Sequence, residues 1–217
     1  RVVDSIGRLV GRITVDDVMD EVREQAERDY QLASGLSQDV ESHDNVFRQT
    51  TARLPWLLIG MLGGIGNSMI LGNFDTTFAA HPEMALYIPL IGGTGGNVGT
   101  QSSALVVQGL ANSSLDSGNT FQQILKESVV ALINATIISM LVYIYNFIRF
   151  GATATVTYSV SISLFAVVMF ASIFGTLVPM TLEKLKIDPA IATGPFISIT
   201  NDIIGMMMYM GITVLLS

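Results

Sequence analysis

Asp202 is the residue whose position most strongly indicates chemistry. It is the only charged side chain between Pro189 and Ser217, and a helix rising about 1.5 Å per residue would carry it some 20 Å from the start of that stretch, near mid-bilayer. An ionised carboxylate at that depth costs on the order of 3 kcal/mol or more. None of the 11 Lys and Arg residues lies inside an apolar run. We therefore expect Asp202 to be protonated, held by a polar neighbour, or neutralised as part of a cation or proton site.

Small and polar residues recur around this acid at helical spacing. Gly194, Ser198 and Asp202 stand four residues apart, so a helix would place them on one face, with Asn201 and Gly205 beside it. The lining of an ion pore requires a face of this kind. The sequence therefore predicts that these residues line a pore.

The residues that flank this face have simpler interpretations. Asp188 is placed to cap a helix whose first residue is Pro189, and its carboxylate is also a candidate metal ligand. The run from Met206 to Met208 is expected to contact the core or lipid instead of a metal.

A second polar segment contains the densest glycine run, comprising Gly92, Gly93, Gly95, Gly96 and Gly99. Its spacing does not complete a dinucleotide-binding fingerprint, and no soluble strand precedes it. In a membrane these glycines permit close helix contact, and polar neighbours such as Asn97 can bond between helices or line the pore. Pro89 and the glycines are expected to weaken the helix, so that some freed carbonyls face a cavity or the ion.

Glu127 follows Lys126 at a predicted helix start. An acid there is favoured by the helix dipole. Two interpretations stay open, a terminal charge and a metal ligand at the mouth of a pore.

The elements that must position these residues are membrane helices. The chain is 50% hydrophobic and 13% charged, with a mean hydropathy of +0.53, which is too apolar for a soluble domain of 217 residues. Five stretches can each span a bilayer: Leu54 to Phe74, Met84 to Leu115, Ser128 to Ile148, Phe150 to Leu182, and Pro189 to Ser217. The predicted fold class is an all-α membrane protein with five transmembrane helices.

One stretch briefly imitates a strand. Hydroxyl residues alternate from Thr153 to Ser163, which we interpret as a loop or helix entrance. A spanning barrel is not expected, because the other segments are long continuous apolar runs.

The basic residues predict the orientation. All but Arg149 fall in the segment before Leu54 or in the links near Lys126 and Lys184, which five spans place on one side. The N-terminus is therefore expected in the cytoplasm and the C-terminus outside a plasma (inner) membrane.

Other function classes find little support. The chain has no cysteine and only two histidines, too far apart for a convincing zinc site. A formal charge of −7 without a basic patch does not indicate nucleic-acid binding. Hydroxyls such as Ser102 and Ser103 have no His or Lys base at depth, so an enzyme is not expected.

The N-terminal segment is acidic. Thr14 and Asp17 form a variant capping box, and apolar spacing predicts a helix from about Val15 to Leu32. Its crowded acids are Asp17, Asp20, Glu21, Glu24 and Glu27, which share one side. They form either a solvated face paired with arginines or a sensor that divalent cations such as Mg²⁺ or Ca²⁺ bridge to another acidic surface.

The predicted division has three parts. Residues 1–14 contain a short hairpin and are expected to be the tail of an upstream domain, residues 15–53 form a cytoplasmic helix and linker, and residues 54–217 form the transmembrane domain.

Four motifs carry a family resemblance: LPWLLIGMLGG at Leu54 to Gly64, GGNVGTQSSALVVQGLA at Gly95 to Ala111, KE at Lys126 and Glu127, and DPAIATGPFIS with the following Asn201, Asp202, Gly205 and Tyr209. The chain resembles the membrane domain of the MgtE-type magnesium channel family over essentially its whole length. Residues 4–20 resemble the end of the cystathionine-synthase-type (CBS) regulatory domain that precedes the channel, followed by its connecting, or plug, helix. The chain departs from the family at Gln108, where Arg is frequent, and at Gly194, where a larger polar residue can occur.

The resemblance implies a homodimer in a lipid bilayer, with the pore along the dimer axis and Mg²⁺ bound by Asp202 of both subunits. Ser198 and Gly194 would line that pore, and an upstream cytoplasmic regulatory domain would be a partner. The alternatives are a secondary transporter that exchanges Mg²⁺ for Na⁺ or H⁺, and a non-conducting scaffold or sensor subunit.

Overall fold

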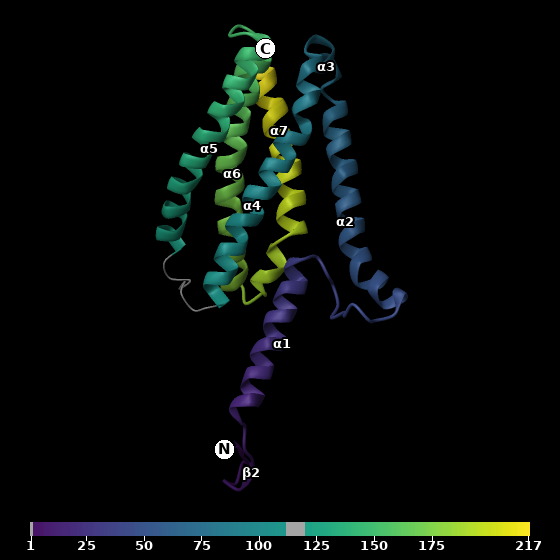
Figure 1. Ribbon diagram of the computed structural model, residues 1–217, viewed down its shortest axis with the longest axis vertical. Helices are drawn as coiled ribbons and strands as arrows, with labels where there is room; N and C mark the ends of the chain where they lie inside the picture. Colours follow the sequence, from purple (N-terminus) through teal and green to yellow (C-terminus); the bar gives the residue numbers. More distant parts are fainter. Residues whose placement is uncertain (1, 112–119) are drawn as a thin grey trace.

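A computed structural model describes residues 2–111 and 120–217, and these form mostly helices, with a short N-terminal hairpin and non-helical links between helices (Figure 1). Among them, four helices are long and apolar enough to cross a membrane: Val46–Gly72, Phe121–Phe150, Thr155–Lys184 and Pro195–Leu216. The prediction of an all-α membrane protein is confirmed.

The N-terminal elements project away from the helix bundle. Strands β1 (Val2–Val3) and β2 (Leu9–Gly11) pair antiparallel, and helix α1 (Val15–Ala33) follows. Thr14 caps α1, because its hydroxyl accepts from the Asp17 N–H at 3.2 Å while Asp17 Oδ2 accepts from the Thr14 N–H at 2.7 Å. The capping box is therefore present, and α1 extends one residue beyond the predicted end. It buries none of its residues.

Helix α2 (Val46–Gly72) begins earlier than the apolar pattern predicted. Asn45 caps it by accepting from the Arg48 N–H at 2.8 Å, so the polar residues before Leu54 are already helical. A short helix α3 (Asp75–Ala80) and a 3₁₀ helix η1 (Pro82–Tyr87) lead from α2 to α4.

Helix α4 (Ile88–Ala111) is unbroken, and the expectation that Pro89 and the glycines weaken it is wrong. Pro89 lies in the first turn, where a missing N–H removes no intrahelical hydrogen bond. The predicted end of this span, Leu115, lies outside the described residues. Helix α4 contains many glycine and polar residues and is not among the four described helices that are long and apolar enough to cross a membrane. The count of five transmembrane helices therefore stays a prediction.

Helices α5 (Thr120–Phe150) and α6 (Thr155–Lys184) form an antiparallel pair. The hydroxyl alternation is helical from Thr155 onward, and only the short turn before it is a loop. Ser161 Oγ donates to the Thr157 carbonyl at 2.8 Å, whereas the buried hydroxyls of Ser159 and Ser163 have no hydrogen-bond partner among the described residues.

The last apolar stretch is not one helix. A 3₁₀ turn η3 (Pro189–Ala192) is followed by a break, and α7 (Pro195–Leu216) starts after Gly194, whose φ is +52°. Asp202 therefore lies roughly 10 Å along α7, in its first third, instead of at the centre of a longer helix.

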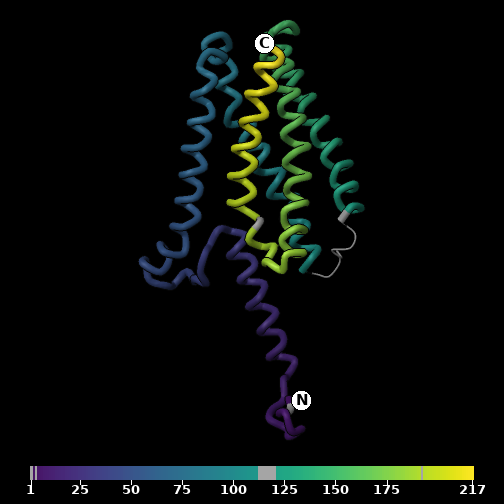
Figure 2. The backbone as a smooth tube through the Cα atoms, turned by 180° about the vertical axis from the view of Figure 1, so that it is seen from behind, coloured from purple at the N-terminus to yellow at the C-terminus, as the bar shows by residue number. Residues whose placement is uncertain are grey.

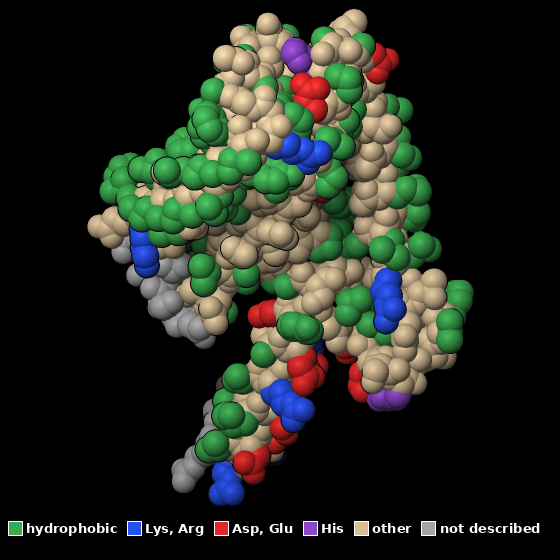
Figure 3. All heavy atoms as spheres, turned by 45° about the horizontal axis from the view of Figure 1, so that its top comes forward, with side chains coloured by type: hydrophobic (Ala, Val, Ile, Leu, Met, Phe, Trp, Pro, Cys, Tyr) green, Lys and Arg blue, Asp and Glu red, His purple; other side chains and the backbone are tan. Residues whose placement is uncertain are grey.

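Helix α6 is central to the bundle. Its residues Val160, Leu164 and Val167 are fully buried, and they belong to one core with Ile91 of α4 and Tyr209 of α7. Figures 1 and 2 agree that α2 stands at one edge and α5 at the other. In Figure 3 hydrophobic side chains cover much of the bundle, whereas acidic side chains with a few basic ones among them follow α1.

Glycines set the spacing between α4 and its neighbours. A Cβ on Gly175 of α6 would collide with the carbonyl oxygen of Gly99, and a Cβ on Gly95 would lie 2.9 Å from Val167 Cγ1. These contacts require bare backbone, so α4 lies deep against α6 and α7.

Candidate functional site

Asp202 and Ser198 of α7 face a strip of bare backbone on α4. A Cβ on Gly96 would lie 2.8 Å from Ser198 Oγ and 3.4 Å from Asp202 Oδ1, and one on Gly92 would lie 3.5 Å from the same carboxylate oxygen. We call this contact the α4–α7 seam, consisting of Gly92, Gly96, Ser198 and Asp202. The predicted shared face of Ser198 and Asp202 is present in the seam.

The carboxylate of Asp202 is without a protein counterion in the described part of the chain. No hydrogen bond or ion pair joins it to a described residue, and the side chain is half-buried. The described residues also contain no group of three or more His, Cys, Asp and Glu that could hold a metal ion by themselves. One carboxylate and one hydroxyl are therefore what a single copy offers in the seam.

A groove of about 610 Å³ reaches the seam from the side of α1. Ser198 lines it together with Arg53 and Gly60 of α2 and Gly35 at the end of α1. The groove therefore opens onto the first turn of α7.

Gly194 lies outside α7 and therefore does not extend the helix face that contains Ser198 and Asp202. It is the residue before α7, and a Cβ there would collide with the backbone carbonyl of Ala33 at the end of α1. On the other side of this junction, a Cβ on Gly35 would lie 2.6 Å from Pro195 Cγ. Gly194 and Gly35 therefore let α1 touch the start of α7.

The other predicted pore-lining residues lie in different surroundings. Asn201 is fully buried against Gly99, and neither polar atom of its side chain has a hydrogen-bond partner among the described residues. Gly205 packs against α6, where a Cβ on this glycine would lie only 3.2 Å from Val167 Cγ1. Asn97 is exposed on α4. Within one copy these three residues do not share the seam with Asp202.

Asp188 acts as a cap. Its Oδ1 accepts the Ala190 N–H at 2.8 Å, so it starts the 3₁₀ turn η3 instead of a long helix. Asp188 also lines a cavity of about 400 Å³ with Asp29 of α1 and Glu183 of α6. Its assignment as a metal ligand stays a prediction.

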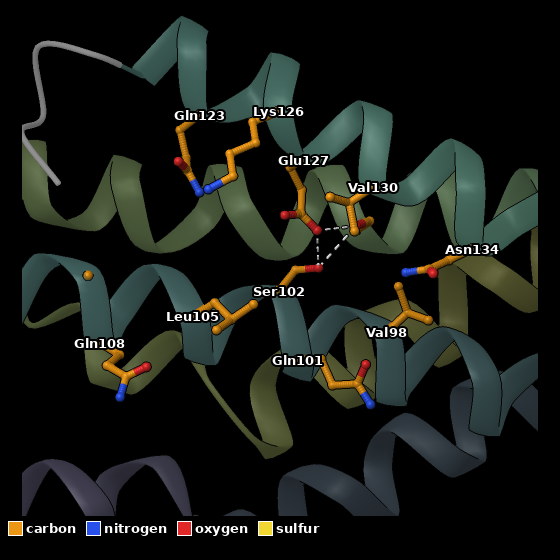
Figure 4. Close-up of a pocket in the computed structure, with 12 residues that line it drawn as sticks. Val98, Gln101, Ser102, Leu105, Gln108, Gln123, Lys126, Glu127, Val130 and Asn134 are labelled. Carbon is orange, nitrogen blue, oxygen red and sulfur yellow. Dashed lines mark hydrogen bonds between the residues drawn. The ribbon is translucent and has the colours of Figure 1, made fainter. Parts of the chain in front are cut away.

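Glu127 is not at a helix start, because α5 already runs from Thr120. The side chain is 8% exposed and lies between α4, α5 and α6 (Figure 4). Ser102 Oγ donates to Glu127 Oε1 at 2.6 Å, and Ser172 Oγ donates to the same oxygen. The terminal-charge interpretation is wrong, because α5 extends two turns further toward its N-terminus than the apolar pattern indicated.

Ser172 belongs to this site although the sequence did not predict it. It lies inside a long apolar run of α6, and its only signal is a hydroxyl among aliphatic neighbours. Its hydrogen-bond partner Glu127 lies on another helix and far away in the sequence, so helical spacing could not identify Ser172 as a site residue.

The acidic face of α1 is largely occupied by local interactions. Glu27 pairs with Arg23 at 3.0 Å, Glu24 pairs with Arg28, and Asp17 belongs to the capping box. Hydrogen bonds from the Thr14 hydroxyl and backbone N–H hold the pKa of Asp17 below its usual range. Asp20 and Glu21 form no ion pair with a described residue. The solvated interpretation therefore accounts for three of these five acids.

Comparison with known proteins places these features in a family. A family model described as the divalent cation transporter MgtE matches residues 88–212. The chain is 33% identical over 211 residues to the magnesium transporter MgtE of Bacillus subtilis, covering 97% of this chain and 47% of that protein. It is 33% identical over 221 residues to the magnesium transporter MgtE of Thermus thermophilus, covering 99% and 48%. The chain thus spans about half the length of the curated relatives it matches, and the family match over more than half of it shows that it belongs to the MgtE family of divalent cation transporters.

Proposed function

We propose that this chain forms the pore of a magnesium channel in which Asp202 binds the conducted ion. The observation that carries this proposal is the carboxylate of Asp202, half-buried beside glycine backbone and without a protein counterion in the described residues. Relatives named magnesium transporters support Mg²⁺ as the ion.

The active unit is a homodimer with the pore on its two-fold axis. Two symmetry-related Asp202 side chains carry about two negative charges, which one Mg²⁺ cancels. Since Mg²⁺ gives up water reluctantly, the carboxylates hold its hydration shell instead of the bare ion. Binding of this moderate strength admits the ion and still releases it, as conduction requires.

Ser198 lies on the cytoplasmic approach to this site. It lines the groove between α1, α2 and α7 and also faces Gly96 in the seam, one turn before Asp202. A hydrated ion would pass this hydroxyl before it meets the carboxylates.

Flux of Mg²⁺ into liposomes tests the proposal. Asp202→Asn removes both pore charges with little change in volume, and we expect flux to be abolished or strongly reduced while the dimer stays folded. Asp75→Asn, the same change at an exposed acid of α3, serves as the matched control and should conduct normally. Near-normal flux through the Asp202→Asn protein would refute the assignment.

Ser198→Leu tests the hydrated state of the ion. It adds bulk to the approach without changing charge, so a pathway wide enough for hydrated Mg²⁺ should be blocked. A structure with Mg²⁺ should place Asp202 oxygens roughly 4 Å from the metal through water, whereas direct ligation at about 2.1 Å would indicate a tight transporter site.

The second candidate is a transporter that exchanges Mg²⁺ for Na⁺ or H⁺. The uncompensated charge of Asp202 would then alternate between Mg²⁺ and the coupling ion. Reversal of Mg²⁺ flux by an imposed Na⁺ or H⁺ gradient, together with saturation, would favour exchange over a passive channel.

Orientation and regulation belong to the same proposal. The N-terminus lies in the cytoplasm, and α1 connects an upstream regulatory domain to the pore. Because most acids of α1 are satisfied locally, Mg²⁺-dependent closure requires the acidic surface of that domain. This chain alone should conduct with weak inhibition by cytoplasmic Mg²⁺, and strong millimolar inhibition would contradict the idea.

A further inference from the structure

A polar cavity of about 450 Å³ lies between α4, α5 and α6, on the side of α4 that faces away from α7 (Figure 4). Four side-chain amides line it, those of Gln101, Gln108, Gln123 and Asn134. All lie in helices of the membrane domain, where a polar cavity of this size has to hold water or an ion. We call it the Glu127 chamber.

Glu127 presents an unused carboxylate oxygen in this chamber. Its Oε1 accepts from both Ser102 and Ser172, whose hydroxyl oxygens are 3.0 Å apart. No described residue donates a hydrogen bond to Oε2, although more than nine-tenths of the residue is buried. The two serines hold the side chain through Oε1, and Oε2 is left open to the cavity, where water or an ion can reach it.

The charge of Glu127 is also without a partner in the described part of the chain. Lys126 is the basic side chain among the lining residues, but no ion pair within 4 Å joins it to Glu127. Figure 4 shows why, because the Lys126 ammonium points toward Gln123 and away from the carboxylate. The chamber therefore contains a carboxylate that has no ion-pair partner among the described residues and has room beside it.

We propose that the Glu127 chamber binds a monovalent cation, Na⁺, at a site separate from the pore. Carboxylate, hydroxyl and amide oxygens are hard ligands that suit such an ion. One carboxylate neutralises one monovalent cation, whereas a divalent ion would leave one more positive charge in a low-dielectric site; Lys126, whose ammonium points away from the carboxylate, is present in both cases. At about 30 Å³ per water, the chamber has room for the ion and several waters.

Helix α4 connects the Glu127 chamber to the seam, because it contributes residues to both. Ser102 contacts Glu127, while Gly96 and Gly92 of the same helix face Asp202, and six to ten residues of helix separate them by roughly 9 to 15 Å. An ion bound at Glu127 would hold α4 against α5 and α6. It would thereby fix the positions of Gly92 and Gly96, the α4 residues that face Asp202 in the seam.

Equilibrium binding of radioactive Na⁺ to the purified protein tests the site, with N-methylglucamine chloride keeping ionic strength constant. We expect wild-type protein to bind Na⁺ saturably and to melt at higher temperature as Na⁺ rises. Glu127→Gln should abolish both effects, and Ser172→Ala should weaken Na⁺ binding roughly tenfold. Asp202→Asn should leave Na⁺ binding unchanged, so failure of the chamber and failure of the pore are distinguishable.

Several outcomes would overturn the inference. They are the absence of saturable Na⁺ binding by wild-type protein, its loss in Asp202→Asn, or displacement of Na⁺ from the chamber by equimolar Mg²⁺. If Glu127→Gln does not fold, Ser172→Ala decides, since wild-type affinity in that variant would equally refute the chamber as the site.

Discussion

Gly175 shows how one missing methyl group sets the distance between two helices. A Cβ there would meet backbone atoms of Gly99, which cannot rotate away as a side chain could. We expect Gly175→Ala to force α4 and α6 apart and to destabilise the protein by about 1 to 3 kcal/mol, the usual cost of overpacking. Thermal unfolding in detergent measures the loss.

Gly93→Ala is the matched control for that prediction. It makes the same change on α4, where a Cβ would have nothing within 4 Å. Its melting temperature should equal or exceed that of the wild type, because Ala favours a helix over Gly. Equal destabilisation by both variants would show that close approach is not the cause.

At the scale of single residues, the sequence predicted the position of Asp202 better than it predicted the surroundings of the other site residues. The isolation of Asp202 and the four-residue spacing to Ser198 follow from helix geometry and solvation, and both can be read from one segment. The burial of Glu127 could not be predicted, because it depends on hydroxyls of two other helices. The separate environments of Asn201 and Gly205 likewise depend on how closely α4 and α6 approach α7.

At the scale of elements, the junction between α1 and α7 is held to a close backbone approach. Gly194 combines a φ of +52° with backbone contact to Ala33, so any side chain there is both strained and obstructed. We expect Gly194→Ala to displace the end of α1 from α7, increasing protease cleavage near Ala33. A loss of flux in a Gly194→Leu protein would therefore reflect disruption of the contact between α1 and α7 as well as narrowing of the proposed pore.

Gly211→Ala provides the comparison for the junction. Gly211 lies in α7, and a Cβ there would have nothing within 4 Å. Cleavage near Ala33 should stay at the wild-type level in this variant. If Gly194→Ala also leaves cleavage unchanged, α1 is not held by this contact.

The start of α1 should depend on pH through its capping box. Hydrogen bonds from Thr14 lower the pKa of Asp17 in the folded chain, so their stabilisation is complete above the unfolded pKa of about 3.9. It is lost as pH falls through the lowered folded value. Amide exchange in the first turn of α1, corrected for intrinsic rates, should therefore show protection at pH 7 that disappears in acid.

Thr14→Ala should lower the same protection already at neutral pH, since it removes the hydroxyl that accepts from the Asp17 N–H and donates to Asp17 Oδ2, while the backbone N–H of residue 14 remains. Asp16→Asn, a change at the neighbouring acid outside the capping box, should not. Unchanged protection in Thr14→Ala would mean that the capping box does not stabilise this end of the helix.

Helix positions were largely predictable, whereas their ends were not. Apolar runs located every long helix, because burial in lipid needs long apolar segments. The starts of α2 and α5 were predicted too late because polar turns outside the apolar run can still be helical. The break before α7 was missed because Pro189 and Pro195 both suit a helix start, and only the contact with α1 requires the chain to turn at Gly194.

At the scale of the molecule, the pore that we propose requires a second copy of the chain. Asp202 and Ser198 lie in a seam that supplies one carboxylate, and Asn97 is exposed on the same helix that carries the glycine wall. In the proposed dimer a second copy brings a second Asp202 carboxylate near one axis, and we expect Asn97, on the exposed face of α4, to meet its own copy there. The outer surface of α5, where Leu141 is 62% exposed, would instead face lipid.

Cysteine cross-linking in membranes checks this arrangement without background, because the chain contains no cysteine. We expect Asn97→Cys to give a covalent dimer on mild oxidation, since symmetry brings a residue near the axis close to its own copy. Leu141→Cys on α5 should stay monomeric under the same conditions. Mg²⁺ bound between the two Asp202 side chains should accelerate the Asn97 cross-link, because it replaces repulsion by a shared counterion, and Asp202→Asn should remove that acceleration. Cross-linking at Leu141 but not at Asn97 would place the dimer interface on α5 and contradict a pore lined by α4 and α7.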